Sequence, residues 1–179
     1  MFKDVKPTRS ELLKVRKRIQ LSKKGHDLLK KKRDGLVLEF FEVLETAGQI
    51  RKQLQAEYLA ADRALSIALA MDGASGVRSS AHAVIHDSNV DIRSENIMGV
   101  VVPRVTYARY KKNVGNRGYG IITTSIYIEE AANRYEKLVE LASRAAEVET
   151  SLRRLLTEIE KVKKRINALE QKIIPGLEG

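Results

Sequence analysis

The chain has 179 residues and a mass of 20.1 kDa, which suits a single domain or one long motif with an insert. It contains no cysteine, which excludes disulfide frameworks and thiolate metal sites. Lys and Arg number 33 against 23 Asp and Glu, a formal net charge of +10, yet 43% of the residues are hydrophobic, so a disordered polyelectrolyte is also excluded.

The excess positive charge lies near the start of the chain. Residues 1–35 hold 13 basic and 4 acidic side chains, whereas residues 36–179 hold 20 and 19. Such a segment attracts phosphates, anionic membranes or acidic protein surfaces. The first residues lack the apolar core of a signal peptide, and the longest apolar stretch, near 59–71, is interrupted by charges. We therefore expect a cytoplasmic protein without a transmembrane helix.

Residues 1–72 are expected to form an N-terminal coiled-coil helix. Apolar residues recur every three or four positions over 12–71, the a and d spacing of a heptad, and 14 of the 18 positions fit. Thr8 and Glu11 match a capping box at the helix start, and the run DGASG at 72–76 predicts its end. Three glycines lie inside this helix, either without consequence or because another segment approaches closely: Gly25, Gly35 and Gly48.

Residues 73–121 are expected to form a central insert. The Val- and Ile-rich segments 90–98 and 100–105 indicate a short β-hairpin that turns near residues 94–97. The glycine-rich run NVGNRGYG at 113–120 superficially resembles a phosphate-binding loop, but it lacks the Gly-Lys-Ser/Thr ending. We interpret it as a flexible turn.

Residues 122–179 are expected to form a C-terminal coiled-coil helix. The heptad series over 127–173 has 13 apolar residues in 14 positions, and Pro175 with Gly176 predicts the helix end. Helices of roughly 95 and 80 Å must pair to bury their stripes. A mainly α fold follows: a long antiparallel two-helix coiled coil with a short β-hairpin insert. A parallel homodimer fits less well, because one chain holds two complementary stripes.

The sequence shows no pattern typical of a catalytic site. No nucleophile–base set and no pair of carboxylates converge, so we expect a non-enzymatic protein with no cofactor and no bound metal. The basic run 14–33 fits either nucleic acid or an acidic protein surface. It has no aromatic residue for base stacking and no leucine zipper that could fork across a groove.

The e positions of the heptads predict a surface for a protein partner. In an antiparallel pair these positions share one side, and here they are mostly apolar toward the bend between the helices. An apolar groove of this kind invites a third helix from a partner, unless the central insert folds over it. The expected groove residues are Val37, Leu44, Tyr58, Leu65, Ile128, Tyr135, Ala142 and Leu156.

Both ends of the chain resemble a known family. The runs PTRSELL at 7–13 and KGHDLLKKKRDGL at 24–36, together with TEIEKVKKRINALE at 157–170 and IIP at 173–175, resemble the terminal signatures of the D subunit of A-type and V-type rotary ATPases. NIMGV at 96–100, through Pro103, resembles that family's central hairpin. The γ subunit of F-type enzymes carries a larger α/β domain, for which the 73–121 insert leaves no room.

The resemblance implies a non-catalytic rotor stalk of a proton- or sodium-translocating ATPase. Its partners would be the catalytic A and B subunits, the rotor's F subunit in the apolar groove, and the stalk's C subunit above the membrane ring. A basic coiled-coil protein that binds nucleic acid is the alternative. The hexamer contacts would come from Arg9, Lys14, Arg18, Lys161, Lys164 and Arg165, and a regulatory hairpin would comprise Asn96, Ile97, Met98, Gly99, Val100 and Pro103.

Overall fold

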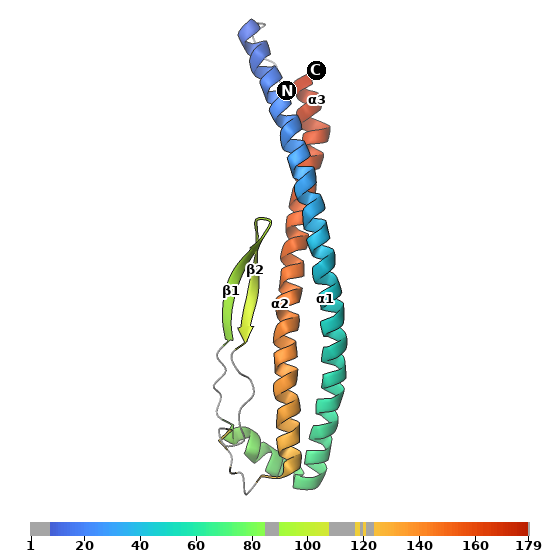
Figure 1. The fold of residues 1–179 in the computed structure, drawn as a ribbon, viewed down its shortest axis with the longest axis vertical. Helices are drawn as coiled ribbons and strands as arrows, with labels where there is room; N and C mark the ends of the chain where they lie inside the picture. Colours follow the sequence, from blue (N-terminus) through green and yellow to red (C-terminus); the bar gives the residue numbers. More distant parts are fainter. Residues whose placement is uncertain (1–7, 85–89, 108–116, 119, 121–123, 179) are drawn as a thin grey trace. The chain divides into compact units, whose positions relative to one another are not determined.

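The computed structural model describes residues 8–84, 90–107, 117, 118, 120 and 124–178. The elements in chain order are helix α1 (Arg9–Ala83), strands β1 (Val90–Ile97) and β2 (Val100–Tyr107), helix α2 (Ile126–Ala168), π-helix η2 (Leu169–Ile173) and helix α3 (Ile174–Glu178) (Figure 1). The two strands form one two-stranded sheet. The expected fold class, two long helices around a small hairpin, is confirmed.

The chain divides into two units that share these elements. Unit 1 comprises residues 1–42, 96–100 and 152–179, and unit 2 comprises 43–95 and 101–151. Each unit contains one segment of α1 and one of α2. The early part of α1 and the last helix α3 therefore belong to the same unit.

The heptad series predicts the core of each unit. In unit 1 the fully buried side chains are Leu36, Leu155, Val162 and Ile166, all a or d positions. In unit 2, heptad residues Ala61, Ala68, Ala131 and Leu141 are buried. Both segments are stable as long helices because each buries its apolar stripe against the other helix.

Contacts inside each unit show that α1 and α2 run antiparallel. In unit 1, His26 bonds to Glu170 of η2, which continues α2, and Lys32 bonds to Glu158 of α2, so the partner number falls as the α1 number rises. In unit 2, Glu57 bonds to Lys137, and farther along α1 Ala68 packs with Ile128. The predicted antiparallel pairing is confirmed in both units.

Glu57 is a charged residue at a buried d position of unit 2. Its carboxylate accepts a hydrogen bond from Lys137 Nζ at 2.7 Å and another from Arg134 Nη1 at 3.4 Å. The bond from Lys137 is the main reason that the pKa of Glu57 is lowered; burial opposes this shift and Arg134 supports it. A polar core residue that needs such partners favours the one register that supplies them.

The start of α1 is capped by Thr8. The backbone N–H of Glu11 donates to Thr8 Oγ1 at 3.4 Å, the first half of the predicted capping box. The Glu11 carboxylate accepts a hydrogen bond from Lys14 Nζ at 2.7 Å. The side chain of Glu11 therefore also neutralises a lysine one turn farther along.

Gly73 interrupts α1, but the helix does not end there. Its backbone has φ 72° and ψ 164°, a region essentially restricted to glycine. Helical residues resume after the kink and continue to Ala83, which the sequence did not predict. Val77 in this continuation packs against a cluster of Ala68, Ile128 and Ala131. Packing of the partly buried Val77 against this cluster favours a helix after the break.

The hairpin turns later than predicted. The strands end at Ile97 and begin again at Val100, so the loop is Met98-Gly99 and not 94–97. Both loop residues have positive φ, 50° and 88°, as a tight two-residue hairpin turn of type I′ requires. Asn96 Oδ1 accepts the Gly99 N–H at 2.8 Å. The Val- and Ile-rich pattern located the strands, whereas backbone conformation determined the turn.

Pro175 does not end the second helix. The preceding turn widens into η2, where the Ile174 N–H donates to Leu169 O five residues back. Proline has no N–H and its ring crowds the carbonyl four residues before it, so a wider turn accommodates it. The extra residue shifts the heptad phase by one position: Ile173, predicted as core, is exposed, while Ile174 and Leu177 are partly buried.

The kink gives a test of glycine's role. Gly73→Ala should lower the free energy of unfolding by about 1–3 kcal/mol, because alanine strongly disfavours this backbone conformation. Gly48→Ala is the matched control: an added Cβ at residue 48 meets nothing within 4 Å. That change should raise stability by up to about 1 kcal/mol through helix propensity. Urea unfolding followed by circular dichroism measures both, and equal effects would contradict this explanation.

Candidate functional site: the basic surface of unit 1

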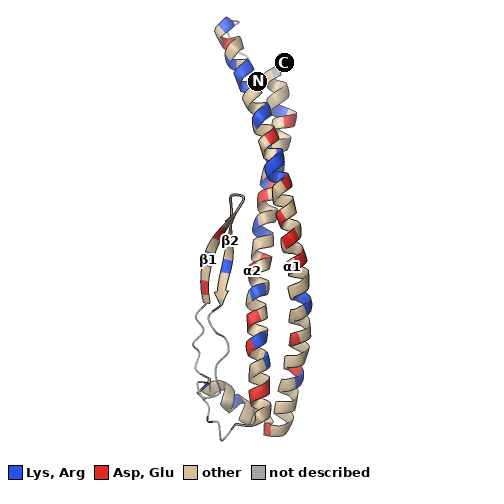
Figure 2. Ribbon diagram, viewed as in Figure 1, with Lys and Arg blue, Asp and Glu red and all other residues tan. Residues whose placement is uncertain are grey.

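The described part of α1 in unit 1 is strongly basic. Residues 9–33 carry 11 Lys and Arg against 2 Asp and Glu, and residues 152–178 carry 7 against 4. Figure 2 shows the concentration of basic residues along the early part of α1. We call this surface, formed by the basic residues of 9–33 and 152–178, the basic surface. All six predicted contact residues are exposed on it: Arg9, Lys14, Arg18, Lys161, Lys164 and Arg165.

Most of these charges are not neutralised within the unit. Lys14 pairs with Glu11 at 2.7 Å. Within the described residues the other five predicted contacts form no ion pair, so their charges face solvent. Solvated charges of this kind interact weakly with each partner group, at about 0–1 kcal/mol for each pair, but they act together and respond to salt.

Exposed leucines interrupt the basic surface, and sequence reasoning missed them. Leu21 is 72% exposed and Leu28 is 67% exposed. Both occupy heptad position c, which faces away from α2, and Lys17, Lys24 and Lys31 lie three or four residues from them on the same helical face. The heptad assignment that identified the core also places these leucines outside it. The result is a row of alternating lysine and leucine.

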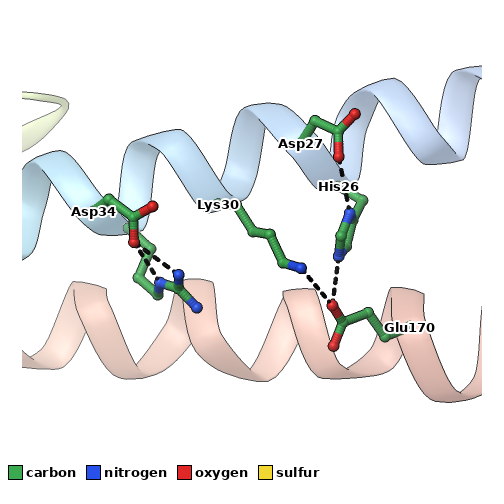
Figure 3. Close-up of polar contacts among 6 residues, drawn as sticks. His26, Asp27, Lys30, Asp34 and Glu170 are labelled. Atoms are coloured by element: carbon green, nitrogen blue, oxygen red, sulfur yellow. Dashed lines mark hydrogen bonds and ion pairs between the residues drawn. The ribbon is translucent and has the colours of Figure 1, made fainter.

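A polar cluster joins α1 and η2 in unit 1 (Figure 3). Glu170 Oε1 lies 2.7 Å from His26 Nε2 and 2.9 Å from Lys30 Nζ, and His26 Nδ1 lies 3.2 Å from Asp27 Oδ1. Lys30, and then His26, lower the pKa of Glu170. His26 occupies an a position, where a polar residue sets the register of the helix pair.

The e-position residues differ in exposure. In unit 2, Leu44, Tyr58 and Ala142 are exposed, whereas Leu65 and Tyr135 are partly buried. Burial, with Asp62 and Tyr58 nearby, raises the pKa of Tyr135. In unit 1, Leu156 is exposed and Val37 is partly buried.

Ile128 is the one predicted groove residue that is buried. It packs with Ala68 and Ala131, and Val77 contacts the same cluster. At this position, therefore, the residues after the Gly73 kink cover the e side of the helix pair. Elsewhere in unit 2, sequence reasoning missed a shallow hollow. It is lined by Ala60, Arg63, Ala64, Ile67, Tyr127, Glu130 and Arg134.

Arg117 is a buried anchor that the sequence did not reveal. Its guanidinium pairs with Glu129 and with Glu136 at 2.9 Å, and it donates to Asn133 at 2.9 Å; the residue is only 1% exposed. The run 113–120 was predicted to be a flexible turn, and residues 113–116 and 119 lie outside the described residues. At Arg117 the chain is fixed to α2 by charged contacts.

The predicted hairpin residues divide between the units. Asn96 to Val100, the tip of the hairpin, belong to unit 1, and Pro103 in β2 belongs to unit 2. Val100 and Val102 are buried, whereas β1 is exposed along almost its whole length. Within unit 2, Glu147 accepts hydrogen bonds from Arg104 Nη1 at 3.2 Å and from the Val105 N–H at 3.1 Å. These contacts fasten the base of the hairpin to α2.

The described residues contain neither a metal-ligand cluster nor a membrane helix. Among them no three or more His, Cys, Asp and Glu side chains gather closely enough to hold a metal ion. None of the described helices combines the length and the apolar character needed to cross a bilayer.

The cluster at Glu170 gives a pH-dependent test. Because the folded state lowers this pKa, its contribution to stability is present above the pKa of the unfolded chain and disappears as the pH falls through the lowered value. Glu170→Gln should therefore lower the melting temperature at pH 7, and the difference from the unmodified chain should shrink below pH about 4. Glu160→Gln, an exposed glutamate without an ion pair among the described residues, is the control. A difference that persists unchanged at low pH would contradict the assignment.

Comparison with known proteins identifies the family. The family model described as the D subunit of ATP synthase matches residues 11–179. The D subunit of the A-type ATP synthase of Methanosarcina mazei is 49% identical over 97% of this chain and 83% of that protein. Its counterpart in Methanococcoides burtonii is 49% identical over 98% of this chain and 85% of that protein. The counterpart in Haloquadratum walsbyi is 48% identical over 99% of this chain and 76% of that protein. The chain therefore belongs to the family of ATP synthase D subunits.

Proposed function

We propose that this chain is the central rotor shaft of an A-type rotary ATPase. It would couple ATP synthesis or hydrolysis in a hexamer of A and B subunits to the rotation of a membrane ring that moves protons or sodium ions. The observation that carries the proposal is family membership across residues 11–179. The antiparallel helix pairing found in each unit supports it, because two helices with a shared core resist twisting better than one.

The basic surface is the proposed contact with the hexamer. In rotary coupling, a stalk must stabilise a different state of each catalytic interface as it turns, which requires a surface that is not uniform around its axis. Unit 1 has such a surface, because the α1 side is far more basic than the α2 side. Weak, solvated pairs suit a contact that breaks at every step.

The exposed leucines favour a protein partner. Phosphates of a nucleic acid would neutralise the lysines, but they would make no apolar contact with the exposed side chains of Leu21 and Leu28. An amphipathic helix on a membrane needs a continuous apolar face, whereas here Lys17, Lys24 and Lys31 interrupt it. A protein surface that combines apolar residues with carboxylates matches both components of the row.

The remaining partners follow from the same proposal. The rotor's F subunit would bind the exposed e-side residues of unit 2, among them Leu44 and Tyr58. The stalk's C subunit would receive the end of the shaft nearest the membrane. The chain would perform no catalysis, because nucleotide is bound by the hexamer, and it would work in the cytoplasm as a peripheral part of the membrane complex.

Reconstitution with the A and B hexamer tests the proposal. The unmodified chain should bind and change ATP turnover. Combined Lys161→Glu, Lys164→Glu and Arg165→Glu should weaken binding about tenfold or more, because three weak attractions become repulsions. Reversal of Arg51, Lys52 and Arg78, three exposed residues of unit 2, gives the same change in net charge and should leave binding nearly intact.

Two outcomes would contradict the rotor assignment. One is an unmodified chain that fails to bind the hexamer or leaves ATP turnover unchanged. The other is tight binding to duplex DNA with a steep salt dependence, which would favour the nucleic-acid alternative.

A further inference from the structure

The tip of the hairpin contacts α1 through Met98. A Cβ built on Gly35 would lie 2.6 Å from Met98 Cε and 2.9 Å from Met98 Sδ, closer than real Cβ atoms approach other atoms. The absence of a side chain at residue 35 therefore makes room for the thioether. Gly25 and Gly48 lie in the same helix, and a Cβ on either would meet nothing within 4 Å. Close approach explains Gly35 alone.

Two locally unfavourable choices meet at this contact. Glycine inside a helix weakens it relative to alanine. Met98 has φ 50°, a left-handed conformation that glycine or asparagine adopts much more readily than methionine. Each residue is unfavourable for its own backbone conformation, but the missing side chain of Gly35 leaves the space that the Met98 side chain fills. Departures from local preference that pair in this way are typical of a functional contact.

The contact can open without unfolding the hairpin. The turn is closed by its own bond from the Gly99 N–H to Asn96 Oδ1. The base is held separately, where Arg104 pairs with Glu95 at 2.6 Å and with Glu147 at 3.2 Å. At the tip the thioether end of one flexible side chain fills the space at Gly35. Release would therefore let the strand ends next to the turn open more often, while the base stays fixed to α2.

We propose that Met98 and Gly35 form a latch that holds the hairpin tip on α1 and opens when a peroxide oxidises Met98. Met98 is 46% exposed, so a small oxidant reaches it. With hydrogen peroxide, the thioether sulfur attacks one oxygen and the O–O bond breaks. The proton on the attacked oxygen passes to the departing hydroxide, which leaves as water. The sulfur loses two electrons and becomes a sulfoxide, and the peroxide is reduced. The added polar oxygen no longer fits against Gly35.

Hydrogen exchange of the isolated 179-residue chain tests the latch without the hexamer, so the result is independent of the rotor assignment. Amides of residues 96–102 should exchange at least several-fold faster in Gly35→Ala than in the unmodified chain. Gly25→Ala and Gly48→Ala are the controls, because they give the same gain in helix propensity at positions where the added Cβ meets nothing within 4 Å. Both should leave the exchange of residues 96–102 unchanged. Unchanged exchange in Gly35→Ala, or equal acceleration in all three variants, would overturn the proposal.

Peroxide treatment tests the oxidation step. Oxidised chain should show the same faster exchange at 96–102, with Met98 sulfoxide identified by peptide mass spectrometry. Met98→Leu retains Met71, which is 62% exposed, and cannot form a sulfoxide at residue 98. Peroxide should therefore leave tip exchange in Met98→Leu unchanged. If peroxide accelerates tip exchange equally in Met98→Leu, or leaves it unchanged in the unmodified chain, oxidation does not open the latch.

Discussion

The antiparallel burial of two heptad stripes is the constraint on which the rest of this structure depends. Neither α1 nor α2 has a globular core of its own, so each is stable as a long helix because it packs on the other. Pairing them fixes which residues face outward, and hence where the basic surface and the exposed leucines lie. Polar core residues such as Glu57 and His26 then determine the register, because only one alignment supplies their partners.

Much of the fold was predictable because a heptad is a local, repeated pattern. The core residues Leu36, Ala61 and Leu155 follow from spacing alone. Features that depend on a single backbone conformation were harder to predict. The hairpin turn at Met98-Gly99 requires positive φ at both residues. The amino-acid composition gives no sign that a methionine would adopt this conformation. The same limit applies to the helix that resumes after Gly73.

The candidate site was predictable in charge but less so in contacts. Lys161, Lys164 and Arg165 lie on the exposed surface as the basic run indicates. Arg117 was not predicted as a site residue because its partners, Glu129 and Glu136, become its neighbours only when Arg117 packs against α2. Leu21 and Leu28 were not predicted as part of the site, because a leucine in a helix is usually interpreted as a core residue. Their exposure to solvent is what indicates a contact surface.

The π-helix at 169–173 has a consequence for insertions and deletions. A π turn is an α-helix that contains one additional residue in the turn. Removing one residue between Leu169 and Ile173 would keep Ile174 and Leu177 on the apolar seam, but the regular α-helix that results would again bring the ring of Pro175 against the carbonyl four residues before it. The same deletion a few turns earlier would rotate Val162 and Ile166 out of the core. A relative that lacks this one residue, and has no proline at the position of Pro175, would thus keep the same apolar seam.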